Sequence, residues 1–277
     1  MSGPHDVRLA CEVGRRARAE LTFAVCDRRT VLAQAYAEPP FRVAPGFVEG
    51  DGLHVILTSS APGIFGGDAL TQTVTVARGA RVRLSSQSAM QVHPSREDAV
   101  ATFACRYLVE SGSHLSCGWD AAIPFPGARF EERIQIDLDP GATLVWSDAV
   151  MSGRAARGER WQFLALAHEL RLTRGGSLVY LERYRIDPGE GGLERRWVAS
   201  DACYFGTVLM VGPEATRATA ERLHHGLAER RDVRASADLL EGEVLLVRLT
   251  AASGPAFHEA RQFCGWGAPL PDPRFPI

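Results

Sequence analysis

Lysine and asparagine are missing from this sequence of 277 residues, so all 31 of its basic residues are arginine. We interpret this absence as a coding bias, although arginine also suits polar interfaces better than lysine does. The 33 acidic residues bring the formal net charge to −2. Because there is no basic excess, the sequence gives no reason to expect binding to nucleic acid or to an anionic membrane.

Long apolar runs are also missing. No stretch approaches the length needed to span a membrane, and the first residues, MSGPHDVRLACEVG, lack the apolar core of a signal peptide. The six cysteines form no CxxC pair and no spacing typical of a disulfide scaffold. From these absences we expect a cytoplasmic protein that keeps its thiols reduced.

Fingerprints of common enzyme and metal sites are missing as well. The sequence contains no GxSxG nucleophile motif, no phosphate-binding GxxxxGK[ST] loop and no strand–GxGxxG–helix pattern. It contains no HxH, HxxxH or CxxC pair either, so a preformed structural zinc site is not expected. One enzyme class stays possible, a β-solenoid carbohydrate-active enzyme. Such enzymes use a pair of carboxylates, and the many acids of this sequence allow accidental pairs.

Glycine is plentiful, and four of the glycines divide stretches of alternating apolar and polar residues. These are Gly79, Gly112, Gly141 and Gly175, and they follow one another at intervals of about 30 residues. In DALTQTVTVARGARVRLSS, for example, the residues on both sides of Gly79 alternate with period two, which is typical of strands. We therefore predict a β-hairpin around each of these glycines.

The repeated units predict a mainly β protein. Residues 1–200 are expected to form a β-solenoid-like or multi-layer β body built of the repeated hairpins. Residues 201–277 are expected to form a small α+β carboxyl-terminal part with two helices, both after about residue 212. The first helix is predicted to begin at Pro213, because PEATRATAERLHHGLAERR places a proline in a first turn. No Pro/Gly/Ser-rich linker separates the two parts, so we expect a single domain over residues 1–277.

Five segments of the sequence carry a resemblance to a known protein family. They are, in chain order, LHVILTSSAPGIFGGDALTQTVTVARGARVRLSSQSAMQVHPS, IPFPGARF, PGATLVW, GRAARGERW and LVYLERYRI. From about residue 53 to residue 186, their order and spacing resemble those of the urease accessory protein family UreD, also called UreH. This resemblance implies a mainly β fold with helices near the carboxyl end and a role that involves no catalysis of its own.

The same resemblance implies partners and a cargo. UreD proteins are scaffolds that bind the urease apoprotein and a UreF-type accessory protein, which in turn recruits a UreG-type GTPase. Together they deliver nickel to the urease active site, so we expect no tightly bound cofactor and at most nickel in transit. Some positions differ from the family pattern, among them Gln91, His93 and residues 118–121. These differences leave a divergent paralogue with another client as an alternative.

The stretch GIFGGDAL contains the first candidate site, which consists of Gly66, Gly67 and Asp68. Two adjacent glycines before a strand predict a sharp bend, because glycine accepts positive φ at little cost. Asp68 falls in the same register as the apolar face that begins at Leu70, so we expect its carboxylate to be turned from solvent and hydrogen-bonded. It could cap local N–H groups of the turn, or it could be a functional acid at the interior or at a partner interface.

Other candidates are scattered through the segments that carry the resemblance. Arg154, Arg157 and Glu159 form a charged loop, which could be solvated or could hold a fixed Arg–carboxylate network for a partner. Gln87 is a further motif position. A nickel ion in transit needs carboxylates and imidazoles that bind it weakly. The candidates for such contacts are Asp68, His93, Asp120, Asp148 and Glu159.

Overall fold

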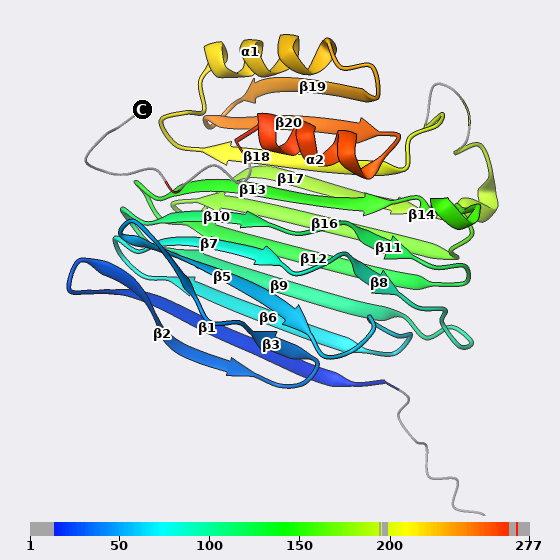
Figure 1. Cartoon of the computed structure of the whole chain (residues 1–277), viewed down its shortest axis with the longest axis horizontal. Helices are drawn as coiled ribbons and strands as arrows, with labels where there is room; N and C mark the ends of the chain where they lie inside the picture. The colour runs from blue at the N-terminus through cyan, green and yellow to red at the C-terminus, as the bar shows by residue number, and fades with distance from the viewer. Residues whose placement is uncertain (1–13, 194, 196–198, 266–269, 271–277) are drawn as a thin grey trace, which may run out of the picture.

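The structure is a computed structural model that describes residues 14–193, 195, 199–265 and 270. It consists mostly of strands, with two α-helices near the carboxyl end (Figure 1). None of the helices in this part of the chain is long and apolar enough to cross a membrane. The cysteines within the same ranges are all free. The prediction of a mainly β fold with a small α part is confirmed.

Two large sheets stack face to face and enclose the core. The first has seven strands, in the spatial order β17 (Ser177–Ile186), β16 (Ala165–Arg174), β12 (Arg129–Leu138), β9 (Ala101–Val109), β6 (Ala69–Val76), β1 (Arg16–Cys26) and β2 (Arg29–Ala37). The strands from β16 to β1 in this order run parallel to one another. The two outer strands, β17 and β2, are antiparallel to their neighbours.

The second sheet is larger. Its main order is β19 (Val233–Leu240), β20 (Val244–Ala251), β18 (Tyr204–Val211), β13 (Thr143–Met151), β10 (His114–Gly118), β7 (Arg81–Ser86), β5 (Gly52–Ser59) and β3 (Phe41–Val43). Three short strands branch from this order, namely β4 (Phe47–Glu49), β8 (Met90–Val92) and β11 (Ala122–Pro124). The remaining elements are the paired strands β14 (Gly153–Arg154) and β15 (Glu159–Arg160) and the 3₁₀ helices η1 (Ala155–Arg157) and η2 (Pro188–Glu190).

The chain winds between the two sheets as in a β-solenoid. Strand β6 of the first sheet leads into β7 of the second, and the pairs β9–β10 and β12–β13 repeat this step one strand further along each sheet. Because β6, β9 and β12 are parallel neighbours, and β7, β10 and β13 are too, each coil lies on the preceding one. This stacking explains the interval of about 30 residues between the turn glycines.

The prediction of a hairpin at each turn glycine is wrong for three of the four. Gly79, Gly112 and Gly141 connect strands of opposite sheets, and only Gly175 closes a hairpin, between the antiparallel strands β16 and β17. All four glycines have positive φ. Alternation with period two marks a strand with one buried face, but it does not reveal whether successive strands share a sheet or face each other across the core.

The core lies between the two sheets, where the apolar side of each strand points inward. Its largest fully buried side chains include Phe23, Leu84, Tyr107 and Trp146. Burial of such side chains stabilises the fold by about 1.5–3 kcal/mol each. Every polar group on this inward side therefore stands out against an apolar background.

The two helices, α1 (Arg217–Ala228) and α2 (Gly254–Phe263), pack on the part of the second sheet formed by β18, β19 and β20 (Figure 1). Their predicted place after residue 212 is confirmed, but the predicted start of the first helix is wrong. Helix α1 begins after Thr216, whose hydroxyl accepts a hydrogen bond from Thr219 N–H at 3.1 Å. This hydroxyl satisfies an N–H group of the first turn, so the helix is capped there and Pro213 stays outside it.

Candidate functional site

The inward face of the first sheet is largely apolar, and one level of it carries three polar side chains. At this level, Glu132 of β12, His168 of β16 and Tyr184 of β17 lie opposite one another in the strand register. The next inward positions on β12 and β16 are apolar, namely Ile134 and Leu170. The alternation of the strands therefore brings three polar side chains together inside the molecule.

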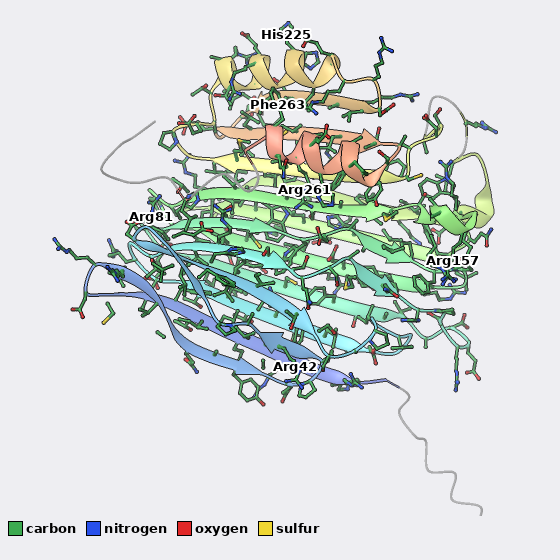
Figure 2. All side chains as sticks on the ribbon, in the orientation of Figure 1. Arg42, Arg81, Arg157, His225, Arg261 and Phe263 are labelled. Atoms are coloured by element: carbon green, nitrogen blue, oxygen red, sulfur yellow. The ribbon has the colours of Figure 1, made fainter. Side chains whose placement is uncertain are left out.

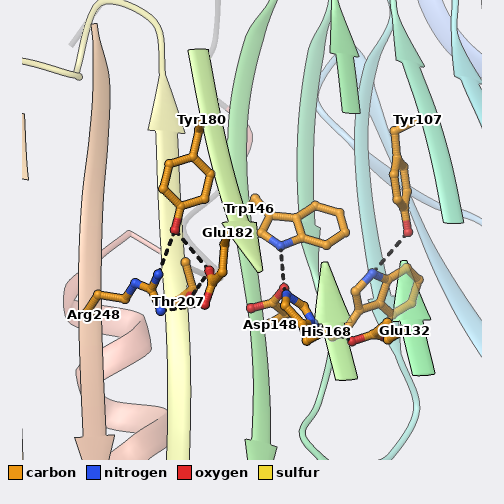
Figure 3. A network of polar contacts seen from close by, with 10 residues as sticks. Tyr107, Glu132, Trp146, Asp148, His168, Tyr180, Glu182, Thr207 and Arg248 are labelled. Atoms are coloured by element: carbon orange, nitrogen blue, oxygen red, sulfur yellow. Dashed lines mark hydrogen bonds and ion pairs between the residues drawn. The ribbon is translucent and has the colours of Figure 1, made fainter. Parts of the chain in front are cut away.

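A second polar row crosses the facing sheet. Asp148 of β13, Thr207 of β18 and Arg248 of β20 are in register with one another. The two rows meet at His168, whose Nδ1 lies 3.0 Å from Glu132 Oε2 and whose Nε2 lies 3.9 Å from Asp148 Oδ2 (Figure 3). We call Glu132, Asp148 and His168 the polar centre.

Burial and nearby charges shift pKa values within the polar centre. Burial by itself lowers the pKa of His168, but the hydrogen bond to Glu132 and the surrounding carboxylate charges outweigh burial and raise this pKa to about 9. Burial raises the pKa of Asp148 to about 6, although the charge of His168 opposes the rise. Trp146 Nε1 donates to Asp148 at 3.0 Å. The imidazole is therefore protonated at neutral pH and balances the charge of the acids around it.

Beside the polar centre, Glu182 of β17 joins the two sheets. Its side chain is buried, and it accepts hydrogen bonds from the Tyr180 hydroxyl at 2.9 Å and from Thr207 Oγ1 at 3.3 Å. Arg248 Nη1 donates to Glu182 Oε1 at 2.5 Å, and Arg248 Nη2 donates to the Tyr180 hydroxyl at 3.0 Å (Figure 3). Both oxygens of this carboxylate therefore have donors, and the arginine supplies the opposite charge.

Two cavities meet at the polar centre. The larger has a volume of about 630 Å³ and is lined by both polar rows and by Glu182. The smaller has a volume of about 270 Å³ and is lined mainly by the loops around residues 58–64 and 86–91. Glu132 and Asp148 line both cavities. The two acids therefore border open space on either side, although their surroundings are otherwise those of a core.

Three of the residues predicted from the sequence line these cavities. Asp148 belongs to both, and Gln87 and Asp120 line the smaller one. Arg261 of α2 is buried (Figure 2). Its Nη1 donates to Trp119 O at 2.9 Å and lies 3.9 Å from Asp120 Oδ1. The second helix thus fixes one wall of the smaller cavity.

Asp68 lies elsewhere, just before β6. Its carboxylate is buried, as predicted, and accepts hydrogen bonds from the backbone N–H groups of Arg15 at 2.7 Å and Phe65 at 2.9 Å. Gly67 has the expected positive φ of 91°, whereas Gly66 is required by a close approach, because a Cβ there would lie 2.8 Å from a backbone atom of another loop. Asp68 lines neither of the two cavities, and its contacts fit the interpretation of an acid that caps the turn.

The remaining candidates lie together at a corner of the coils. Arg154 donates to Glu159 twice, at 2.5 and 2.9 Å, and its guanidinium lies 4.0 Å from the ring centre of Phe125. His93 packs edge-on against the same phenylalanine. Arg157 lies in η1 at one end of the molecule (Figure 2). The predicted Arg–carboxylate pair is thus present, and its use by a partner stays a prediction.

Within the described residues, no group of three or more histidine, cysteine or acidic side chains is arranged to hold a metal ion. The acids and the imidazole that line the cavities are spread out, and each already has a partner in the protein. Such an arrangement offers nitrogen and oxygen ligands one or two at a time. It suits brief contact with a passing cation better than a permanent metal centre.

Sequence reasoning missed Glu132, His168 and Arg248. The sequence signal that could have revealed them is a polar residue at a position where the strand pattern otherwise places an apolar, inward-facing residue. In RFEERIQIDL, for example, Glu132 has the same parity as the apolar residues of the inward face. A single exception of this kind is common in a strand. Only the register shows that the exceptions of several strands coincide.

Comparisons with known proteins identify relatives of this chain. A family model described as UreD urease accessory protein matches residues 15–266. The chain is 35% identical to the urease accessory protein UreD of Sorangium cellulosum (strain So ce56), over 88% of this chain and 78% of that protein. It is 34% identical to the urease accessory protein UreD 3 of Bradyrhizobium sp. (strain BTAi1 / ATCC BAA-1182), over 76% of each. It is 26% identical to the urease accessory protein UreD of Sporosarcina pasteurii, over 84% of this chain and 92% of that protein.

The matched residues include both sheets, the polar centre and both helices. The names of the relatives describe an accessory protein and not an enzyme, which supports a role in urease maturation. The chain therefore belongs to the UreD family of urease accessory proteins.

Proposed function

We propose that this protein is a cytoplasmic scaffold for urease maturation, and that nickel passes its polar centre on the way to the urease active site. In this proposal the chain binds the urease apoprotein and a UreF-type accessory protein, and a UreG-type GTPase joins through the UreF-type protein. Membership of the UreD family supports the maturation role. The individual partners are those that the resemblance implies.

The observation that carries the nickel proposal is the pair of cavities that share Glu132 and Asp148 as wall residues. Imidazole nitrogen and carboxylate oxygen are both suitable ligands for Ni²⁺. A cation that entered an apolar core without such groups would lose its hydration with no compensation. The polar centre offsets this cost at the level where the two cavities meet.

The same geometry explains how the metal would leave again. A permanent site encloses its ion with several fixed ligands, and the part of the chain that the structure describes holds no such group. Glu132 and Asp148 already face the His168 cation, at 3.0 and 3.9 Å. An arriving Ni²⁺ would therefore compete with an internal partner and bind weakly, which a relay requires.

The acids of the polar centre argue against the alternative of a carbohydrate-active enzyme. Such an enzyme needs a pair of carboxyl groups on either side of a sugar, in a groove that the sugar can enter. Here the two acids lie between the sheets and are engaged by His168 and by the indole of Trp146. The names of the relatives favour the accessory role as well.

Co-expression with urease and its other accessory proteins tests the proposal at single residues. Glu132→Gln keeps the size of the side chain and removes its charge, so urease activity should fall roughly tenfold or more, as after the loss of a metal contact. Glu131→Gln is the matched control, because this neighbouring acid on the outer face pairs with Arg133 and lines neither cavity. The control should activate urease as the parent chain does.

A pull-down from the same cells separates nickel handling from assembly. Both variants should recover the urease apoprotein and the UreF-type protein in the amounts that the parent chain recovers. Full activation by Glu132→Gln would contradict the nickel route. Failure of the parent chain to recover either partner would contradict the scaffold role.

A further inference from the structure

A contact between the two sheets forms part of the wall of the larger cavity. The first sheet ends at β17, whereas the second sheet ends in β20 and β19. Glu182 of β17 contacts Arg248 of β20 at this margin (Figure 3). The arginine side chain is 46% exposed, whereas that of the glutamate is only 4% exposed. A half-solvated cation therefore covers a buried anion that lines the cavity.

Hydrogen bonds hold this pair in a fixed arrangement. The guanidinium of Arg248 donates both to Glu182 and to the Tyr180 hydroxyl, and this hydroxyl donates to the other oxygen of Glu182. An arginine in a protein does not give up its proton. Loss of a proton from the arginine therefore cannot release the carboxylate, and the guanidinium itself has to move away.

The two members of the pair differ in how far they can move. Arg248 has a long side chain whose charged end can turn into solvent, where water replaces its hydrogen bonds. Glu182 is enclosed, and a buried charge left without a counter-charge is strongly unfavourable. The pair should therefore open in exchange for a second cation and not spontaneously.

We propose that Arg248 controls the access of cations to Glu182 in the larger cavity. In the free chain its guanidinium is paired with this carboxylate, and a divalent cation reaches the carboxylate only by displacing the guanidinium. The inference rests on the nickel route proposed above. It gives Arg248 a role in selectivity, because a monovalent ion that replaces the guanidinium brings no additional charge, whereas Ni²⁺ brings one more. Arg248 is in this sense a positioning residue for the cargo and not a ligand.

Calorimetric titration of Ni²⁺ into the purified full chain, without a histidine tag, tests directly whether Arg248 competes with nickel. Arg248→Met removes the competing charge and keeps much of the side-chain length, so nickel should bind at least about fivefold more tightly. The double variant Arg248→Met/Glu182→Gln should return to the affinity of the parent. Arg234→Met is the matched control, because Arg234 lines the same cavity but lies 3.9 Å from Asp201. Its nickel affinity should equal that of the parent.

Two results would overturn the proposed role of Arg248. One is a nickel affinity of folded Arg248→Met equal to that of the parent, together with a lower melting temperature, which would make the arginine a purely structural clamp. The other is equal tightening in Arg234→Met, which would reveal a general effect of surface charge. If the nickel affinity of Arg248→Met is unchanged while urease activation still depends on Glu132, the role of Arg248 is rejected and the maturation role stays intact.

A second variant keeps the test decisive if Arg248→Met does not fold. Tyr180→Phe retains both charges and removes the hydroxyl that fixes the guanidinium to the carboxylate. Displacement of the arginine becomes easier, so nickel should bind about twofold more tightly than to the parent. An unchanged or weaker nickel affinity in this variant would contradict the competition between Arg248 and nickel for Glu182.

Discussion

Two buried aspartates of this protein have the same exposure and different surroundings. Asp68, before β6, and Asp148, in β13, are each 8% exposed. Asp68 accepts hydrogen bonds from two backbone N–H groups. Asp148 instead contacts side chains, the indole of Trp146 and the imidazole of His168. Of the two aspartates, only Asp148 lines the two cavities.

The kind of partner decides what each acid can do. Backbone donors are fixed by the fold, so the carboxylate of Asp68 cannot turn to a ligand without breaking the turn that it caps. Side-chain donors can be exchanged, so Asp148 can give up a partner for an incoming cation. Burial alone does not separate a structural acid from a functional one. The comparison predicts opposite responses to mutation at the two sites.

The largest loss of stability is expected at the turn beside Asp68. Gly67→Val places a β-branched residue at a φ of 91° and should lower the free energy of unfolding by about 3 kcal/mol. Gly189→Val is a control, because the backbone of Gly189 does not have positive φ and no heavy atom lies near an added Cβ. Urea denaturation measures both variants. A loss at Gly67 no larger than that at Gly189 would refute the importance of this bend.

Removal of the charge of Asp68 should be the next most damaging change. In Asp68→Asn the amide keeps one acceptor, so one of the two backbone N–H groups loses its partner. A buried donor without a partner costs about 2 kcal/mol. Urea denaturation at neutral pH should show this loss. An unfolding free energy equal to that of the parent would mean that the acid is dispensable for the turn.

The polar centre should make stability depend on pH in the alkaline range. The pKa of His168 is raised to about 9 in the folded chain, from an ordinary value of 6.5. Its charged contacts therefore stabilise the fold fully below pH 6.5, and this contribution is lost as the pH rises through 9. Since one pKa unit corresponds to about 1.4 kcal/mol, the free energy of unfolding should fall by roughly 3 kcal/mol across this range.

His168→Gln tests the origin of this dependence, because glutamine cannot take up a proton. Urea denaturation of the parent and the variant at pH 6.5, 8 and 9.5 gives the two slopes. The variant should show a clearly flatter slope above pH 6.5 than the parent. Equal slopes would place the dependence on other groups and contradict the charged state of the imidazole.

The smallest effect on stability is expected at Asp148. Asp148→Asn keeps the shape and an acceptor for Trp146 Nε1, and it removes a charge whose burial is itself unfavourable. The unfolding free energy should change by less than about 1 kcal/mol. Thermal and urea denaturation together check this result. A loss as large as that of Asp68→Asn would remove the distinction between the two acids.

Much of the fold follows from local patterns in the sequence. The alternation around the turn glycines predicted strands with one buried face, and the register from Leu70 predicted the burial of Asp68. The same pattern could not predict that Gly79 joins opposite sheets, because hydrogen-bond partners lie in other coils. The sequence resemblance supplied the family, and the comparisons confirmed it.

The candidate site was harder to predict because it arises from several strands at once. Asp148 was found through its motif, but Glu132 and His168 became visible only when their strands were placed side by side. Glu182 and Arg248 lie on different sheets, and their contact depends on how the sheets stack. Contacts of this kind are tertiary, and no local pattern in one strand encodes them.

The nickel content of urease tests the central claim most directly. Urease is purified, in its complex with the accessory proteins, from cells that co-express the parent chain, Asp148→Asn or Asp68→Asn. Mass spectrometry then gives the nickel content per urease molecule in each complex. With Asp148→Asn, the nickel content should fall to roughly a tenth or less, while the complex still forms. With Asp68→Asn, less complex should form, but its nickel content should equal that with the parent chain. Full nickel loading with Asp148→Asn would contradict the passage of nickel through the polar centre.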